Sequence, residues 1–231
     1  MPARPPEQPP RGPGMLVLVV DDHELVATSI VMSLRVEGLA TQLCKARGIA
    51  QILAEAASLE PGLVLLDLDL GRDHEGNRVD GVDLVGPFMA AGWQVLVLSG
   101  SADHARIGSA LDAGALAWVP KHAPFPTLLA SVREAVAGRP VMSPERRQKF
   151  IDLYHQRDAE SRVLTEKLDR LTQREREVLA ELARGRRAQA VADHFVVSLA
   201  TVRTQIRAVL TKLEVGSQLE AVALYRRATR S

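Results

Sequence analysis

The chain has 231 residues, which favours two domains of ordinary size. No apolar run approaches the ~20 residues of a membrane-spanning helix, and the single cysteine excludes an internal disulfide, so we expect a soluble cytoplasmic protein with no membrane contact. Residues 15–138 hold 8 Lys and Arg against 15 Asp and Glu, whereas residues 165–231 hold 13 against 8. Only the C-terminal part therefore has the charge that favours a nucleic-acid partner.

The first predicted segment is a proline-rich tail. Residues 1–14 contain six prolines and no apolar stretch of the kind that a signal peptide needs. A segment of this composition cannot bury enough apolar surface to fold, so we predict a disordered tail.

Residues 15–138 alternate short apolar runs with helical patterns, which is typical of a parallel α/β sheet. The first, third and fourth runs lack polar residues, as expected of strands that are covered on both faces. The predicted strands are Leu16–Val20, Ala40–Cys44, Leu63–Leu66, Val95–Leu98 and Ala117–Val119.

Polar side chains follow four of these five strands. Asp21 and Asp22 follow the first strand, Asp67 the third, Ser99 the fourth and Lys121 the fifth. In parallel sheets, ligands bind beyond the carboxyl ends of the strands. Three carboxylates gathered there would repel one another without a cation, and oxygen ligands of this kind suit Mg²⁺. A carboxylate beside Mg²⁺, with a hydroxyl and an ammonium nearby, is equipped to attack a phosphoryl donor.

The motifs VLVVDDHELV, LVLLDLDL, VLVLSGSA and GALAWVPK resemble the receiver domain of two-component response regulators over essentially all of residues 15–138. The resemblance implies an α/β flavodoxin-like (βα)5 fold and a sensor histidine kinase as phosphodonor. It implies that Asp67 is the phosphoacceptor, that Ser99 senses the phosphoryl group and that Lys121 pairs with it. The implied Mg²⁺ ligands are Asp21, Asp22, Asp67 and the backbone carbonyl of Asp69.

Trp118 and the loop at residues 71–80 each have more than one interpretation. Trp118 occupies the place of the family's switch aromatic, and packing of the fifth strand is an equally good interpretation. The glycine that follows the phosphoacceptor in the family matches Gly81, so residues 71–80 contain an insertion of about six residues rich in Asp, Glu and Arg. The insertion could slow phosphotransfer, restrict the donor kinase, or be a solvated surface loop, since surface loops usually tolerate insertions.

Residues 139–166 are predicted to be a linker, mostly helical. Ser143 is a suitable cap, Pro144 suits the first helical position, and the acid that follows suits the first turn. The apolar stripe is interrupted at Arg157, Asp158 and Ser161, so it does not indicate a coiled coil. We expect a connecting helix that is exposed on most sides and partly paired in a dimer.

Residues 167–231 carry the pattern of a compact helix-turn-helix. Thr172 stands three residues before Glu175, which is the spacing of a capping box. Gly185 supplies the left-handed position that ends a helix, and Ser198 caps the next long helix.

That long helix, residues 199–213, has one apolar face and an opposite face of cations and hydroxyls. Such a helix suits the major groove of double-stranded DNA. The runs LTQREREVL, TVRTQ and KLEV resemble the LuxR-type helix-turn-helix, in which this helix reads DNA. One departure is Gln205, where the family often has His, and this puts the preferred DNA sequence in doubt. The candidate DNA contacts are Thr201, Arg203, Thr204, Gln205, Arg207 and Lys212.

The whole chain thus resembles a NarL/FixJ-type response regulator, a phosphorylation-controlled transcription regulator that is not an enzyme in the ordinary sense. A homodimer is expected, through the receiver surface or through a final helix that Ser217 and Glu220 would start with another capping box. Two alternatives stay open. The receiver could be an unphosphorylated sensing module, or the Asp67-Leu68-Asp69 run could belong to a haloacid-dehalogenase-like phosphatase, although that family places its motif after an earlier strand.

Overall fold

The computed structural model describes residues 14–100 and 103–229. Residues 1–13, which include almost all of the predicted tail, lie outside the described residues. The chain divides into two compact units, residues 1–155 and residues 156–231. Within the described ranges, no helix has the length and apolar character needed to cross a membrane.

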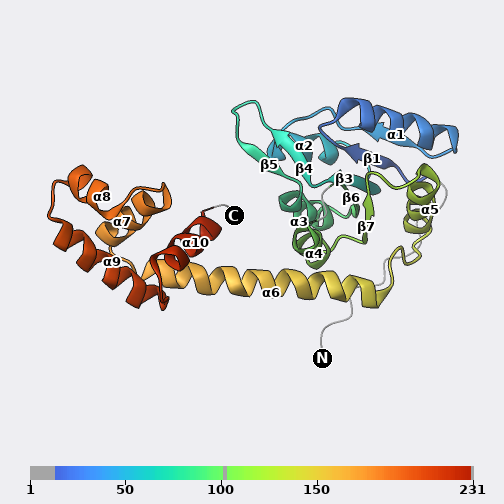
Figure 1. Ribbon diagram of the computed structural model, residues 1–231. Helices are drawn as coiled ribbons and strands as arrows, with labels where there is room; N and C mark the ends of the chain where they lie inside the picture. The colour runs from blue at the N-terminus through green and yellow to red at the C-terminus, as the bar shows by residue number, and fades with distance from the viewer. Residues whose placement is uncertain (1–13, 101–102, 230–231) are drawn as a thin grey trace. The chain divides into compact units, whose positions relative to one another are not determined.

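The first unit contains a five-stranded parallel sheet in the order β2-β1-β3-β6-β7, which is the doubly wound flavodoxin-like order. The sheet lies among its helices in Figure 1. All five strands predicted from the sequence are present, so the predicted fold of this unit is confirmed. The strands are β1 (Val17–Val20), β2 (Thr41–Leu43), β3 (Leu63–Asp67), β6 (Gln94–Ser99) and β7 (Ala117–Pro120).

Helices cover both faces of the sheet, because alternate strand residues pack into two separate apolar cores. One core includes residues of α2, α3 and α4, and the other includes residues of α1 and α5. This packing leaves the carboxyl edge of the strands as the place where polar side chains meet. The helices are α1 (Glu24–Val36), α2 (Ile49–Ala57), α3 (Val82–Ala90), α4 (His104–Asp112) and α5 (Phe125–Val136).

The insertion after the third sheet strand is a β-hairpin rather than an irregular loop. Its antiparallel strands are β4 (Asp69–Arg72) and β5 (Arg78–Asp80). The turn is fixed by the Asp73 carboxylate, whose Oδ1 accepts hydrogen bonds from the backbone N–H groups of Glu75 at 2.9 Å and Asn77 at 2.8 Å. Strands this short and polar give no periodic sequence signal, which is why the pattern of residues 71–80 indicated only a loop.

Helix α6 (Pro144–Asp169) begins where the sequence predicted, and Ser143 Oγ accepts a hydrogen bond from the N–H of Arg146 at 3.3 Å. Its first half belongs to the first unit and is not an exposed connector. Phe150 is only 7% exposed and lies in the same core as α2, α3 and α4. The division between the two compact units falls inside α6, after His155, within the predicted linker of residues 139–166.

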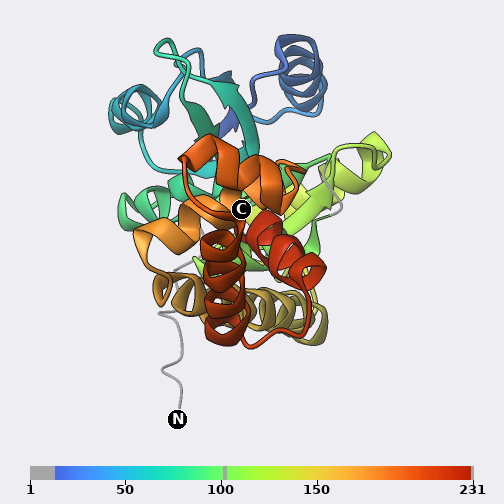
Figure 2. The same cartoon turned by 60° about the vertical axis from the view of Figure 1, so that its left-hand side comes forward.

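The second unit is all-helical, as predicted, and is drawn from yellow-orange to red in Figure 2. The Thr172–Glu175 capping box is present with both reciprocal hydrogen bonds. The second predicted box is only half formed, because the Glu220 carboxylate accepts from the N–H of Gly216 at 3.0 Å instead of that of Ser217. The helices after α6 are α7 (Gln173–Ala183), α8 (Ala188–Phe195), α9 (Leu199–Leu213) and α10 (Gln218–Ala228).

Candidate functional site

Three strand ends of the first unit meet at one ammonium group. The Lys121 Nζ, beyond β7, lies 2.7 Å from Oδ2 of Asp67 at the end of β3 and 2.7 Å from Oδ2 of Asp21 beyond β1. The side chains of Asp67 and Asp21 are 2% and 1% exposed. Two buried carboxylates are thus paired with one partly buried cation, as the strand-end pattern predicted.

Burial and charge act against each other at this cluster. Burial raises the pKa of the Asp67 carboxyl above its usual value, and this effect exceeds the opposing hydrogen bond and charge of Lys121. Desolvation alone would lower the pKa of Lys121, but its hydrogen bonds to Asp21 and Asp67 outweigh desolvation and hold that pKa above the usual value. Ionised Asp67 therefore depends on a nearby positive charge.

The same edge offers ligands for a divalent cation. Asp21, Asp22, His23 and Asp67 each supply an atom, and these atoms lie within 4.8 Å of one another. Oδ1 of Asp67 is a buried carboxylate oxygen for which the described residues provide no hydrogen-bond partner. Carboxylate oxygens of this kind fit Mg²⁺. Sequence reasoning missed His23, whose Nδ1 lies 2.7 Å from Asp22 Oδ1, because one histidine beside two acids has no distinctive spacing.

The other predicted residues of this site each have contacts of their own. Ser99 ends β6, is 1% exposed, and its carbonyl accepts a hydrogen bond from the N–H of Lys121 at 3.1 Å. Asp69 begins β4 with its carboxylate 3.1 Å from Arg78, so this side chain is not part of the acid cluster. The Trp118 ring packs edge-on against Phe150, with centroids 5.6 Å apart. This contact is enough to explain the position of the Trp118 ring.

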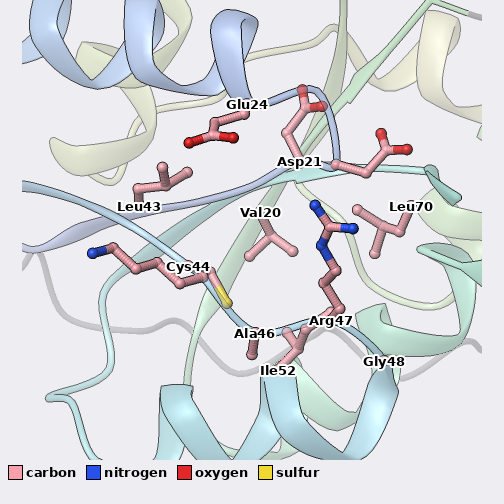
Figure 3. A pocket seen from close by; sticks show the side chains of 12 residues that line it. Val20, Asp21, Glu24, Leu43, Cys44, Ala46, Arg47, Gly48, Ile52 and Leu70 are labelled. Carbon is pink, nitrogen blue, oxygen red and sulfur yellow. The ribbon is translucent and has the colours of Figure 1, made fainter. Parts of the chain in front are cut away.

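A pocket of about 310 Å³ opens beside the acids, between the ends of β1 and β2, the start of α2 and strand β4. Asp21 and Asp22 line one side of this pocket, and Figure 3 shows the guanidinium of Arg47 pointing toward that side. The Cys44 thiol also lines it, and burial raises the pKa of this thiol to about 12, which leaves it unreactive at neutral pH.

In the second unit, α9 is anchored by buried apolar residues and exposes its polar face. Thr201, Arg203, Thr204 and Arg207 are exposed, and Gln205 is half-buried. The buried anchors of α9 are Val202, Val209 and Leu213.

Lys212, the sixth candidate DNA contact, is placed differently. Its Nζ lies 3.0 Å and 2.7 Å from the two carboxylate oxygens of the buried Glu175. Glu175 also closes the capping box of α7, so this ion pair ties α9 to α7 within the second unit. Lys212 thus forms an ion pair within the second unit, and only the sequence pattern links this residue to DNA.

Comparison with known proteins gives a consistent result. Residues 17–133 match the response regulator receiver domain, and residues 169–225 match the bacterial regulatory proteins of the luxR family. Response regulator protein VraR of Staphylococcus aureus (strain Mu3 / ATCC 700698) is 30% identical over 208 residues, covering 89% of this chain and 93% of VraR. Transcriptional regulatory protein LnrK of Bacillus subtilis (strain 168) is 27% identical over 214 residues, covering 90% and 94%.

Solved structures include the RcsB response regulator of Salmonella typhimurium, which has a TM-score of 0.49 and 20% identity over 92% of this chain and 98% of that chain. The receiver match alone covers just over half of this chain, and the luxR-family match follows it in the second unit. The chain therefore belongs to the NarL/FixJ-type response regulators, which join a receiver domain to a LuxR-type DNA-binding domain.

Proposed function

We propose that phosphorylation of Asp67 controls how this response regulator binds double-stranded DNA. The observation that carries the proposal is the cluster at the strand ends, where Asp67 is buried beside Lys121 and keeps one carboxylate oxygen without a hydrogen-bond partner among the described residues. A sensor histidine kinase is the proposed phosphodonor, because the receiver family takes part in two-component systems.

The proposed reaction is an in-line phosphoryl transfer. A carboxylate oxygen of Asp67 forms a bond to phosphorus while the bond from phosphorus to the donor nitrogen breaks, and the leaving imidazole keeps the electron pair and takes up a proton. Asp21, Asp22 and the backbone carbonyl of Asp69 would hold Mg²⁺, which offsets the charge of the phosphoryl oxygens. Lys121 would then exchange its contact with Asp67 for a phosphoryl oxygen.

Phosphorylation also supplies the signal in this proposal. It adds about 1.5 to 2 negative charges at the end of β3, next to Lys121, and β3 pairs with β6, which ends at Ser99. Lys121 and the Ser99 hydroxyl would move toward the phosphoryl group and displace the segment that leads into α4. The product is a changed receiver surface rather than a released metabolite, so the proposed role is regulation and not turnover.

The first test follows the mass of the intact protein after treatment with a small acyl phosphate and Mg²⁺. We expect wild type to gain one phosphoryl group and Asp67→Asn to gain none, because the amide oxygen is a poor nucleophile. Asp83→Asn, which changes an exposed acid in the first turn of α3, is the matched control and should gain the group normally. Chelation of Mg²⁺ should suppress the gain in wild type. Phosphorylation of Asp67→Asn at the wild-type rate would overturn the acceptor assignment.

The second test addresses DNA reading by α9. Arg203 and Arg207 lie four residues apart on its exposed face, and we propose base contact for Arg203 and phosphate contact for Arg207. Arg203→Ala should then lower affinity for a selected site by about 1 to 3 kcal/mol and affect random DNA less. Arg207→Ala should weaken both and reduce the salt-dependence slope by about one unit.

Arg162→Ala removes an exposed arginine of α6 and is the control for this DNA measurement. Unchanged affinities for both α9 variants would show that this helix does not enter the groove. We further propose that two copies bind together as a homodimer, because a single helix-turn-helix buries little surface and paired half-sites supply the missing affinity.

A further inference from the structure

The hairpin β4–β5 packs directly against the acid cluster. Strand β4 begins at Asp69, two residues after Asp67. Gly71 in this strand has φ +64°, and a Cβ atom placed on it would lie 2.7 Å from Oδ2 of Asp22. The backbone of β4 thus borders one candidate metal ligand and contains another, the carbonyl of Asp69.

The hairpin has little means of holding this position by itself. Its ladder pairs only Asp69 with Asp80 and Arg72 with Arg78, with an irregularity between them. A two-stranded hairpin of this length is marginally stable in water. Leu70 and Val79 anchor the hairpin in the apolar core with α2, α3 and α4, and its polar edge beside Asp22 is left to polar contacts.

The polar contacts come from Arg106, in the first turn of α4. Its side chain is 17% exposed, and Nη2 donates to the backbone carbonyl of Leu68 and to Oδ1 of Asp80, the latter at 2.8 Å. Nη1 lies 3.8 Å from Oδ1 of Asp69. One guanidinium thus contacts the residue just after the phosphoacceptor and both ends of the hairpin. Its planar fork suits several acceptors at once in a way that a single ammonium does not.

We propose that Arg106 is a positioning residue for the divalent-cation site, which it serves by fixing the β3–β4 backbone and the hairpin against α4. The inference rests on the proposed function, because it takes Asp22 and the Asp69 carbonyl as Mg²⁺ ligands. Loss of Arg106 leaves Asp22 and the Asp69 carbonyl less constrained. Mg²⁺ must then order these two ligands as it binds, and this cost in free energy lowers its affinity. Partners that orient metal ligands in this way typically change affinity by about 10- to 100-fold.

Electrostatics alone predicts the opposite change in Mg²⁺ affinity, so the measured change distinguishes the two effects of Arg106. Arg106 is a cation near Asp67 and Asp69, and it repels a second cation at the site. Removing its charge without any loss of positioning would tighten Mg²⁺ binding. Weaker binding in a variant without this charge is therefore the signature of positioning.

The experiment measures the rise in unfolding temperature as Mg²⁺ is added to the unphosphorylated full chain, with each variant's metal-free value as its own baseline. We expect Arg106→Ala to bind Mg²⁺ about tenfold more weakly than wild type. Arg106→Lys keeps a donor and the charge and should recover part of the affinity. Arg78→Ala is the matched control, because Arg78 pairs with the same Asp69 from an exposed position on the hairpin, and should bind Mg²⁺ like wild type.

Affinity for Mg²⁺ that is unchanged or tighter in Arg106→Ala would overturn the inference, and so would an equal loss in Arg78→Ala. If Arg106→Ala does not fold, Asp80→Ala removes the carboxylate that accepts from Arg106, and wild-type affinity in that variant would also overturn the inference. Failure of the proposed function looks different, because wild type itself would then show no stabilisation by Mg²⁺.

Discussion

At the scale of single residues, the proposed phosphoacceptor site is a cluster in which two carboxylates share one ammonium group. Asp21 and Asp67 share the ammonium of Lys121, and burial makes the ionised form of Asp67 costly without it. In the proposed reaction a phosphoryl group would bring new negative oxygens to the same place, so Lys121 would gain a competing partner. This change of partner at Lys121 would affect the ends of three strands, β1, β3 and β7, at once.

Gly71→Ala tests whether the backbone of β4 constrains the Asp22 carboxylate. In Gly71→Ala the new methyl group would displace the Asp22 carboxylate, so we expect Mg²⁺ binding to weaken about tenfold, along with a stability loss of about 1 kcal/mol from the left-handed backbone. Gly76→Ala is a matched control, because Gly76 has φ +86° in the same hairpin and open space around the position of a Cβ. Mg²⁺-dependent unfolding temperatures compare the two variants. Equal Mg²⁺ affinities would show that Gly71 does not constrain Asp22.

The site residues differ in how far the sequence could identify them. Asp21, Asp67 and Lys121 stand at strand ends, and the parallel sheet brings such ends together whatever the details of packing. Arg106 contacts Leu68 across 38 residues and Asp80, at the end of the hairpin, across 26, so no local sequence pattern indicates its role. Lys212 lay within a basic helix pattern, but the pattern could not show that Glu175 pairs with it.

At the scale of elements, α6 joins the first unit by a close-packed contact with α4. Arg147 donates hydrogen bonds to the carbonyl oxygens of Leu111, Ala115 and Leu116 at the end of α4 and beyond. Gly108 leaves room for the helix, since a Cβ placed there would lie 2.0 Å from the carbonyl oxygen of Phe150. The first half of α6 is thus part of the receiver core, next to the Trp118 ring.

Phe150→Ala tests this role of α6. Because Phe150 is buried among α4 and Trp118, its truncation should destabilise the first unit by about 3 kcal/mol. Leu153→Ala on the same helix removes a side chain that is 37% exposed and should cost less than about 1 kcal/mol. Denaturant unfolding of the full chain, followed through the receiver transition, measures both. A Phe150 effect as small as that of Leu153 would mean that α6 is an exposed connector after all.

The sequence pattern of α6 could not reveal this arrangement. Its apolar positions serve one unit before His155 and the other unit after it, so no single stripe runs along the helix. The turn before α9 is similar, because Val196 adopts φ +54° although β-branched residues disfavour that conformation. Tertiary packing overrides the local pattern in α6, whereas the strands and the capped helices follow their local signals.

At the scale of the whole molecule, an acidic receiver precedes a basic DNA-binding unit in one chain. The proposed function requires that these units be energetically coupled, so that phosphorylation at Asp67 changes DNA affinity. Couplings of this kind are typically worth about 1 to 3 kcal/mol, or about 5- to 150-fold in affinity. The alternative of a phosphorylation-independent DNA-binding regulator requires no such coupling.

The most direct measurement is the affinity for a DNA site selected from random sequence, before and after treatment with a small acyl phosphate and Mg²⁺, with the mass of the same samples recorded. We predict that affinity rises at least about fivefold in proportion to the phosphorylated fraction, and that Asp67→Asn shows neither change. A fully phosphorylated wild-type protein whose DNA affinity is unchanged would contradict it.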